Sequence, residues 1–261
     1  TDGCNNIAIG QSALAVSDGD GDNNIAIGGA ALGGADVSGA SNIAIGVNSS
    51  DAITSGACNI AIGAGALTDA TDNCDNIAIG QSALAVSAND GDCNIAIGKS
   101  AMGTGDVSGA DNVGIGREAG NDLTSGIENV FVGTGSGGNS TTGCRNIALG
   151  SNTLGGAITT GNSNVALGFN AMDALTSGAC NIALGENALG AATDNCDNIA
   201  IGKAALAASV NDADNNIAIG ITALGGADVS GANNIALGTS TMDALTSGAC
   251  NIAIGADALG A

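Results

Sequence analysis

Cysteine and aspartate are the residues of this sequence that could bond to one another or hold a metal ion. The chain has eight Cys and 25 Asp plus Glu, but no His and no Tyr. Each Cys comes one or two residues before an Asn, and none forms the C-x-x-C spacing of a zinc or redox site. The cysteines could therefore form disulfides or fill small spaces as buried thiols.

Two pairs of cysteines have a spacing that suits a disulfide. Cys58 and Cys74, and likewise Cys180 and Cys196, come at corresponding corners of consecutive repeats. Stacked repeats of β-structure lie about 4.8 Å apart, which is within the Cα separation that a disulfide requires. We expect both disulfides to form, and this indicates an oxidising, extracellular or cell-surface location.

A short acidic segment offers the second kind of chemistry. Asp18, Asp20 and Asp22 alternate with Gly, and carboxylate oxygens in a flexible loop are ligands that suit Ca²⁺. The Glu that closes an EF-hand loop is absent. The segment is therefore either a calcium site or a solvated acidic turn, and the rest of the sequence requires no cofactor.

Catalysis finds little support in this composition, and we predict that the protein is not an enzyme. General acid–base and nucleophilic mechanisms draw mainly on His, Lys, Tyr or an activated Ser or Cys. Here Ser, Asp and Glu recur in turns at the repeat spacing. The net charge of −21 argues against binding to nucleic acid or anionic membranes. The sequence also has no run of 18 apolar residues that could insert into a membrane.

A five-residue pattern, Asn-Ile-Ala-Ile-Gly at residues 6–10, positions all of these residues. It occurs in 15 copies, 17 or 18 residues apart, with Asn always first and Gly always fifth. Large and small residues alternate within it, as in a β-strand, and Leu or Met follows eight residues after the Asn in 12 copies. A repeat this short cannot hold two helices. The sequence predicts an all-β parallel β-solenoid (a β-roll) of 15 coils with two short strands each, as one domain over residues 1–261.

In this prediction the large aliphatic residues of the pattern point inward and its Ala points outward. The invariant Asn is expected to form a ladder along the stacked coils. The outward Ala would form a flat strip on which a second roll could pack, laterally or in a trimer. The strip begins with Ala8, Ala26, Ala44, Ala61, Ala78 and Ala96. Phe131 replaces one of these Ala residues and is expected to be exposed.

The pattern Asn-Ile-Ala-Ile-Gly followed by Ala-Leu resembles the head repeat of trimeric autotransporter adhesins (the YadA-like head). It is also similar to repeats of bacteriophage tail fibres and related bacterial surface proteins. The resemblance covers all 15 copies, although the coils here are longer than those of the adhesin head. It implies a left-handed β-roll, often trimeric, that serves as an extracellular spacer or adhesive surface.

The two ends of the sequence continue one another. Reading Ala261 directly into Thr1 joins segments that closely match residues 180–202, and it places Cys250 and the next molecule's Cys4 as the second predicted pair is placed. We expect head-to-tail stacking into a filament, with a Cys250–Cys4 disulfide between molecules. A longer covalent repeat is the competing explanation. The shaft of a phage tail fibre or trimeric adhesin, and a calcium- or ice-binding module, are the alternative functions.

Two cysteines have no cysteine at the same corner of a neighbouring coil. Cys93 would face Ala110 on the next coil, and Cys144 would face Glu128 on the previous one. They either remain free or bond to another chain, and we expect free thiols.

Overall fold

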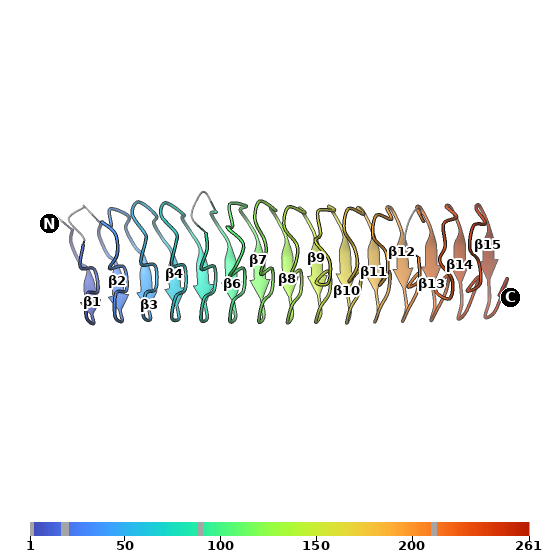
Figure 1. Cartoon of the computed structure of the whole chain (residues 1–261), viewed down its shortest axis with the longest axis horizontal. Coiled ribbons are helices and arrows are strands. Elements are labelled where there is room, and N and C mark those ends of the chain that lie inside the picture. Colours follow the sequence, from blue (N-terminus) through green and yellow to red (C-terminus); the bar gives the residue numbers. More distant parts are fainter. Residues whose placement is uncertain (1–2, 17–20, 88–90, 210–212, 261) are drawn as a thin grey trace. The chain divides into compact units, whose positions relative to one another are not determined.

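The computed structural model describes residues 3–16, 21–87, 91–209 and 213–260. Within these residues it is an all-β parallel β-solenoid, with 15 strands of three residues each and no helix (Figure 1). The chain divides into two compact units, Thr1–Glu128 and Asn129–Ala261, which we describe separately. The strands of the first unit are β1 Ile7–Ile9, β2 Ile25–Ile27, β3 Ile43–Ile45, β4 Ile60–Ile62, β5 Ile77–Ile79, β6 Ile95–Ile97 and β7 Val113–Ile115. Those of the second are β8 Val130–Val132, β9 Ile147–Leu149, β10 Val165–Leu167, β11 Ile182–Leu184, β12 Ile199–Ile201, β13 Ile217–Ile219, β14 Ile235–Leu237 and β15 Ile252–Ile254.

Within each unit every strand pairs in parallel with the strand of the next coil. The register places each residue of the pattern over its counterpart, as Ala26 lies beside Ala44 in the first unit and Ala183 beside Ala200 in the second. A regular period therefore gives a regular stack, because each coil repeats the hydrogen bonds of the one before it.

Each described coil contains one strand rather than the predicted two. The segment around the conserved Leu is a turn, in which Ala30 has φ of 54° and Leu32 has φ of 48°. These are left-handed backbone conformations, which an extended strand cannot contain. The alternation of small and large residues in this segment reflects the turn, whose Leu side chain is buried.

The interior holds the Ala of the pattern rather than its Ile, so the predicted outward Ala strip is wrong. Of its first members, Ala26, Ala44, Ala61, Ala78 and Ala96 are fully buried within the single chain, and Ala8 is exposed in the terminal coil. The physical reason is the thinness of the coil. Buried residues of the opposite turns, such as Leu32 and Ile53, already fill the interior and leave room only for a methyl group. The Ile side chains consequently point outward.

Phe131 is also buried, which corrects its predicted exposure. A Cβ atom added to Gly137, which occupies the usual Leu position of this coil, would lie 2.5 Å from the Phe131 ring. The ring therefore fills the space that Leu fills in other coils. A large residue in the strand and a small one in the turn conserve the interior volume.

Candidate assembly surfaces

The conserved Asn side chains join each coil to the next. Asn24 Oδ1 accepts a hydrogen bond from the backbone N–H of Asn42 over 2.8 Å, and Asn24 Nδ2 donates to the carbonyl of Gly39 over 3.0 Å. Corresponding bonds recur in the second unit, where Asn216 Oδ1 accepts from the N–H of Asn234 over 2.8 Å. The predicted Asn ladder is confirmed, and it consists largely of bonds from side chains to the backbone of the following coil.

The conserved Gly residues form a second ladder, in which the backbones of successive coils approach closely. Gly63 has φ of +140°, and a Cβ atom built on it would lie 2.5 Å from the carbonyl oxygen of Gly80. Gly255, in the last coil, is the exception, since a Cβ atom there would have nothing within 4 Å. A methyl group at this position would collide only with a coil that stacked onto β15, although φ of +125° also strains the backbone of any residue other than Gly.

The outward side chains at the first and third positions of every strand form a surface that we call the aliphatic face. All of these residues are Ile, Val or Leu. In the first unit Ile62 and Ile115 are 36% and 38% exposed, and in the second Leu167 and Ile219 are 45% and 39% exposed. Sequence reasoning missed this face because it placed the same residues inside.

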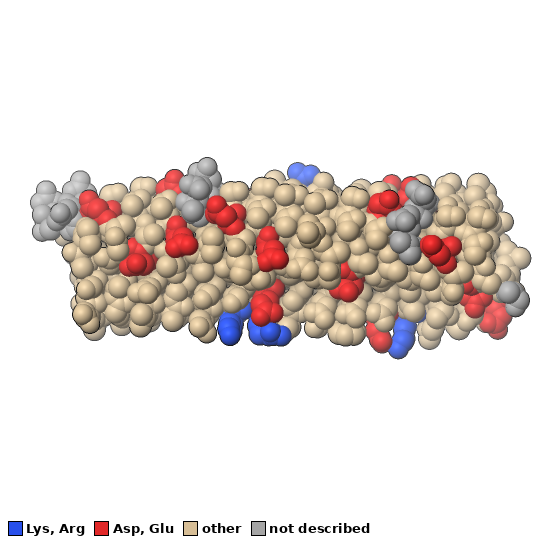
Figure 2. Space-filling view, in the orientation of Figure 1, with Lys and Arg blue, Asp and Glu red and all other residues tan. Residues whose placement is uncertain are grey.

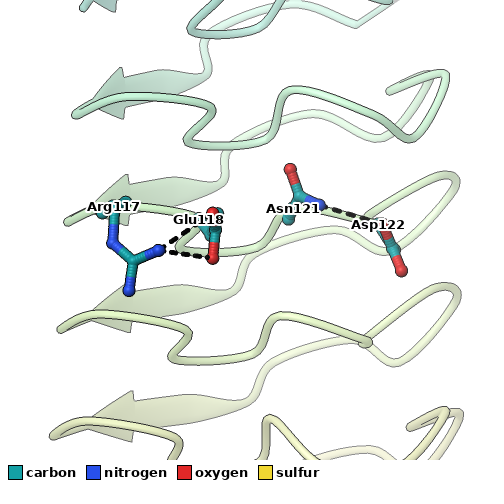
Figure 3. A network of polar contacts seen from close by, with 4 residues as sticks. All are labelled: Arg117, Glu118, Asn121 and Asp122. Carbon is teal, nitrogen blue, oxygen red and sulfur yellow. Dashed lines mark hydrogen bonds and ion pairs between the residues drawn. The ribbon is translucent and has the colours of Figure 1, made fainter.

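Charged side chains are scattered over the surface, and most of them are acidic (Figure 2). Arg117 forms an ion pair with Glu118, and Lys203 forms one with Glu186, both at 3.1 Å. Figure 3 shows that the Arg117 guanidinium faces the Glu118 carboxylate on one coil, beside the bond from Asn121 to Asp122. Because these side chains are about half exposed, each pair contributes little to stability.

None of the eight cysteines forms a disulfide in the structure, so the predicted disulfides Cys58–Cys74 and Cys180–Cys196 are absent. The two members of each pair are offset by one residue along the corner. Cys74 therefore lies over Ala57 rather than Cys58. Its Sγ accepts from the N–H of Ala57 at 3.4 Å and donates to the carbonyl of Asp72 at 3.3 Å.

Two other corner cysteines also form hydrogen bonds between Sγ and backbone groups. Cys196 repeats the arrangement of Cys74, with its Sγ 3.4 Å from the N–H of Ala179. Cys144 Sγ donates to the carbonyl of Thr142 at 3.4 Å. Cys4 and Cys250 lie exposed in the two terminal coils, and a bond between them across molecules stays a prediction.

Cys93 lies in the most acidic surroundings of these thiols. Its N–H donates to the carbonyl of Cys74 at 3.1 Å. Desolvation and the negative charges of Asp111, Asp75 and Asp92 raise the pKa of the Cys93 thiol. A raised pKa keeps the thiol protonated and lowers its reactivity.

Two aspartates of the acidic segments accept hydrogen bonds from backbone N–H groups. Asp18 and Asp20 lie outside the described residues, but Asp22 Oδ1 accepts from the N–H of Cys4 at 2.6 Å. Asp92 binds the N–H of Cys74 in the same way, at 2.7 Å. Among the residues that the structure describes, no group of three or more acidic or cysteine side chains could hold a metal ion.

No protein-family model and no curated protein matches this chain. The likeness to adhesin heads and tail fibres therefore remains a resemblance of the repeated pattern, while the parallel β-solenoid itself is established by the structure. In the described part of the chain no helix is long and apolar enough to cross a membrane.

Proposed function

We propose that this chain is a structural protein whose coils stack end to end into an extracellular filament or surface appendage. The observation that supports this is the state of the two edge strands. β1 pairs only with β2, and β15 pairs only with β14, yet both keep the residue pattern of the paired strands. Ile252 and Ile254 are 67% and 70% exposed at one edge, and Ile9 is 59% exposed at the other. Edges of this kind invite pairing with another strand.

The hydrogen bonds inside the stack indicate how one molecule would join the next. The N–H of Ile235 donates to the carbonyl of Asn251, and the N–H of Gly255 donates to the carbonyl of Leu237, both over 2.8 Å. At the two ends of the strand, each coil thus donates one N–H to the next coil and accepts one N–H from it.

The two edges offer the same groups in complementary positions. On β15 they are the N–H of Ile252 and the carbonyl of Ile254. On β1 they are the carbonyl of Asn6 and the N–H of Gly10. A β1 placed on β15 in the usual register would therefore match each donor with an acceptor. An extracellular location belongs to the proposal and is supported by the resemblance of the pattern, not by disulfides.

A Gly255→Ala variant tests the stacking, with Gly29→Ala as its control. The methyl at residue 255 meets nothing within the chain, whereas a stacked coil would bring a carbonyl about as close as Gly255 O is to a Cβ on Gly238, 2.6 Å. A Cβ on Gly29 also meets nothing within 4 Å, so this control should assemble normally.

Gly65→Ala controls for backbone strain, because Gly65 has φ of +65° and a Cβ there comes no closer than 3.4 Å to another side chain. We expect wild-type, Gly29→Ala and Gly65→Ala protein to form filaments under the electron microscope. Gly255→Ala should remain folded by circular dichroism but form no long filaments. Gly255→Ala filaments of normal length would refute the proposal. Mass spectrometry of the reduced native material would then test the competing explanation. A species of 24.3 kDa supports assembly, whereas a much larger one means that the coils continue within one polypeptide.

A further inference from the structure

We infer that the aliphatic face is a contact surface on which two copies of this chain pack as a two-fold pair, sheet against sheet, with their strands antiparallel. This side-to-side contact uses a different surface from the edges of the proposed filament and does not depend on end-to-end stacking.

The first support is the composition and exposure of the face. Every outward position of the 15 strands is Ile, Val or Leu. Several of these side chains keep more than a third of their surface exposed even in central strands, as Ile62, Ile115, Ile147 and Leu167 do. A single exposed aliphatic residue needs no explanation, but continuous apolar rows mark an interaction surface.

The second support is the area of the face. Three strand residues extend about 10 Å, and neighbouring strands lie about 4.8 Å apart. The seven strands of the first unit therefore cover about 340 Å², and the eight of the second about 380 Å². Projecting side chains expose more than this flat area, so the face of each unit by itself is an apolar patch of several hundred Å², the size at which such patches mark an interaction surface.

The third support identifies the occupant as a second copy. The outward side chains recur at the strand spacing, so a face with the same spacing can match them row for row. This chain carries such a face. A partner must also tolerate a net charge of −21. The aliphatic face contains no charged residue, and its two flanks have net charges of opposite sign, although Arg145 lies on the acidic flank and Glu186 on the basic flank.

The flanks of the face decide the orientation of the pair. Exposed acidic residues precede the conserved Asn, at Asp75 and Asp111 in the first unit. Exposed basic residues follow the conserved Gly, at Lys99 and Arg117 of the same unit. A two-fold axis parallel to the direction of stacking reverses the strands of the partner. It therefore lays the basic flank of each copy over the acidic flank of the other.

One coil of the second unit has the same arrangement, whereas Arg145 before Asn146 and Glu186 after Gly185 have the opposite charges. Asp197 precedes β12 and Lys203 follows it, and both are exposed on the same coil. In the two-fold pair, Lys203 of one copy would lie opposite Asp197 of the other. The in-chain pair of Lys203 with Glu186 is itself about half exposed, which leaves Lys203 able to exchange partners. Opposite charges at a rim favour this orientation over the reverse one.

The test uses the Gly255→Ala background, in which end-to-end stacking is blocked, and measures mass by sedimentation equilibrium. We expect twice 24.3 kDa at micromolar concentration. The double variant Leu167→Glu/Ile219→Glu should dissociate to the single-chain mass, with affinity lowered more than 100-fold. Ile158→Glu is the matched control. Ile158 is 64% exposed but lies outside the strands, so its variant should remain paired.

A charge exchange tests the orientation. Lys203→Glu should weaken the pair about tenfold at low salt, and adding Asp197→Lys should restore most of the lost affinity. A purely structural role of Lys203 would give no such rescue. A single-chain mass for the background protein, a threefold mass, or equal dissociation of Ile158→Glu would overturn the two-fold pair. The first of these results would leave filaments of the wild-type protein unaffected, so failure of this inference can be distinguished from failure of the proposed function.

Discussion

Replacing the conserved Gly63 by Ala should destabilise the solenoid far more than replacing a glycine two residues away. The new methyl would lie 2.5 Å from the carbonyl oxygen and 2.6 Å from the carbonyl carbon of Gly80. Both neighbours are backbone atoms, held by hydrogen bonds of 2.8 Å from Gly63 N to Ile45 O and from Gly80 N to Ile62 O. The clash can be relieved only by opening this part of the ladder.

The size of the effect follows from two contributions. A backbone with φ of +140° is open almost only to Gly, and a side chain there costs about 1–3 kcal/mol. Opening the two ladder hydrogen bonds costs about 1 kcal/mol each. We therefore expect the free energy of unfolding to fall by about 3–5 kcal/mol, a large share of the stability of an ordinary domain.

Two controls separate strain from collision in this experiment. Gly65 has φ of +65°, and a Cβ atom there would come no closer than 3.4 Å to Thr68 Oγ1. Gly65→Ala should therefore cost about 1 kcal/mol, because only the left-handed backbone resists it. Gly29→Ala meets nothing and should change stability by less than about 0.5 kcal/mol. Urea unfolding followed by circular dichroism measures all three. Equal effects of Gly63→Ala and Gly65→Ala would refute the proposed collision.

Three further predictions concern the corners and the acidic residues. Asp92→Ala should lower the free energy of unfolding by about 1–2 kcal/mol, measured by heat or urea, because the N–H of Cys74 loses its acceptor. Asp92→Asn should be tolerated, because Asn162 accepts the corresponding bond from the N–H of Cys144. Equal losses of stability in the two variants would contradict this. Desolvation raises the pKa of Asp173, so its contribution to stability is full below the ordinary pKa of Asp and is lost as the pH rises through the raised value. Asp173→Asn should therefore gain stability relative to wild type between pH 3 and 7, and a pH-independent difference would exclude this cause. Thiol titration of the unassembled chain in denaturant should find eight free thiols, and a lower number would reveal disulfides within the chain.

The sequence was sufficient to predict the stack of coils and its Asn ladder. Asn and Gly recur without exception at one spacing, and each has a role that other residues cannot fill. Asn24 bonds to two backbone groups of the next coil, and Gly63 lies where a Cβ atom would collide. Such roles depend only on the period, so they can be inferred before any packing is known.

The direction of the strand side chains could not be predicted from alternation alone. Ile-Ala-Ile shows that two residues face one way and one the other, but not which way is inward. The usual rule places large residues inside. It fails here because the turns already supply Leu32 and similar residues to a thin interior. One signal was available: Phe131 replaces Ala in the same coil in which Gly137 replaces Leu. This exchange of volume indicates that the two positions face each other.

The disulfide prediction failed for a smaller geometric reason. Cys58 comes one residue before its Asn, but Cys74 comes two residues before, so the two belong to different rows of the corner. Stacking places Ala57 against Cys74, and the thiol points to that backbone instead. An offset of one residue is enough to exchange a covalent partner for a hydrogen bond.

The inverted interior also links the two proposed modes of assembly. A coil that buries Ala and Leu leaves its largest aliphatic side chains outside, so much of its hydrophobic stabilisation becomes available only through a partner. The face of one unit is smaller than a standard interface, and its area grows with every coil that is added. End-to-end stacking would therefore strengthen side-to-side pairing, because linked faces bind together at high effective concentration. Short stacks should pair weakly and long ones tightly, which would couple the growth of a filament to its thickness.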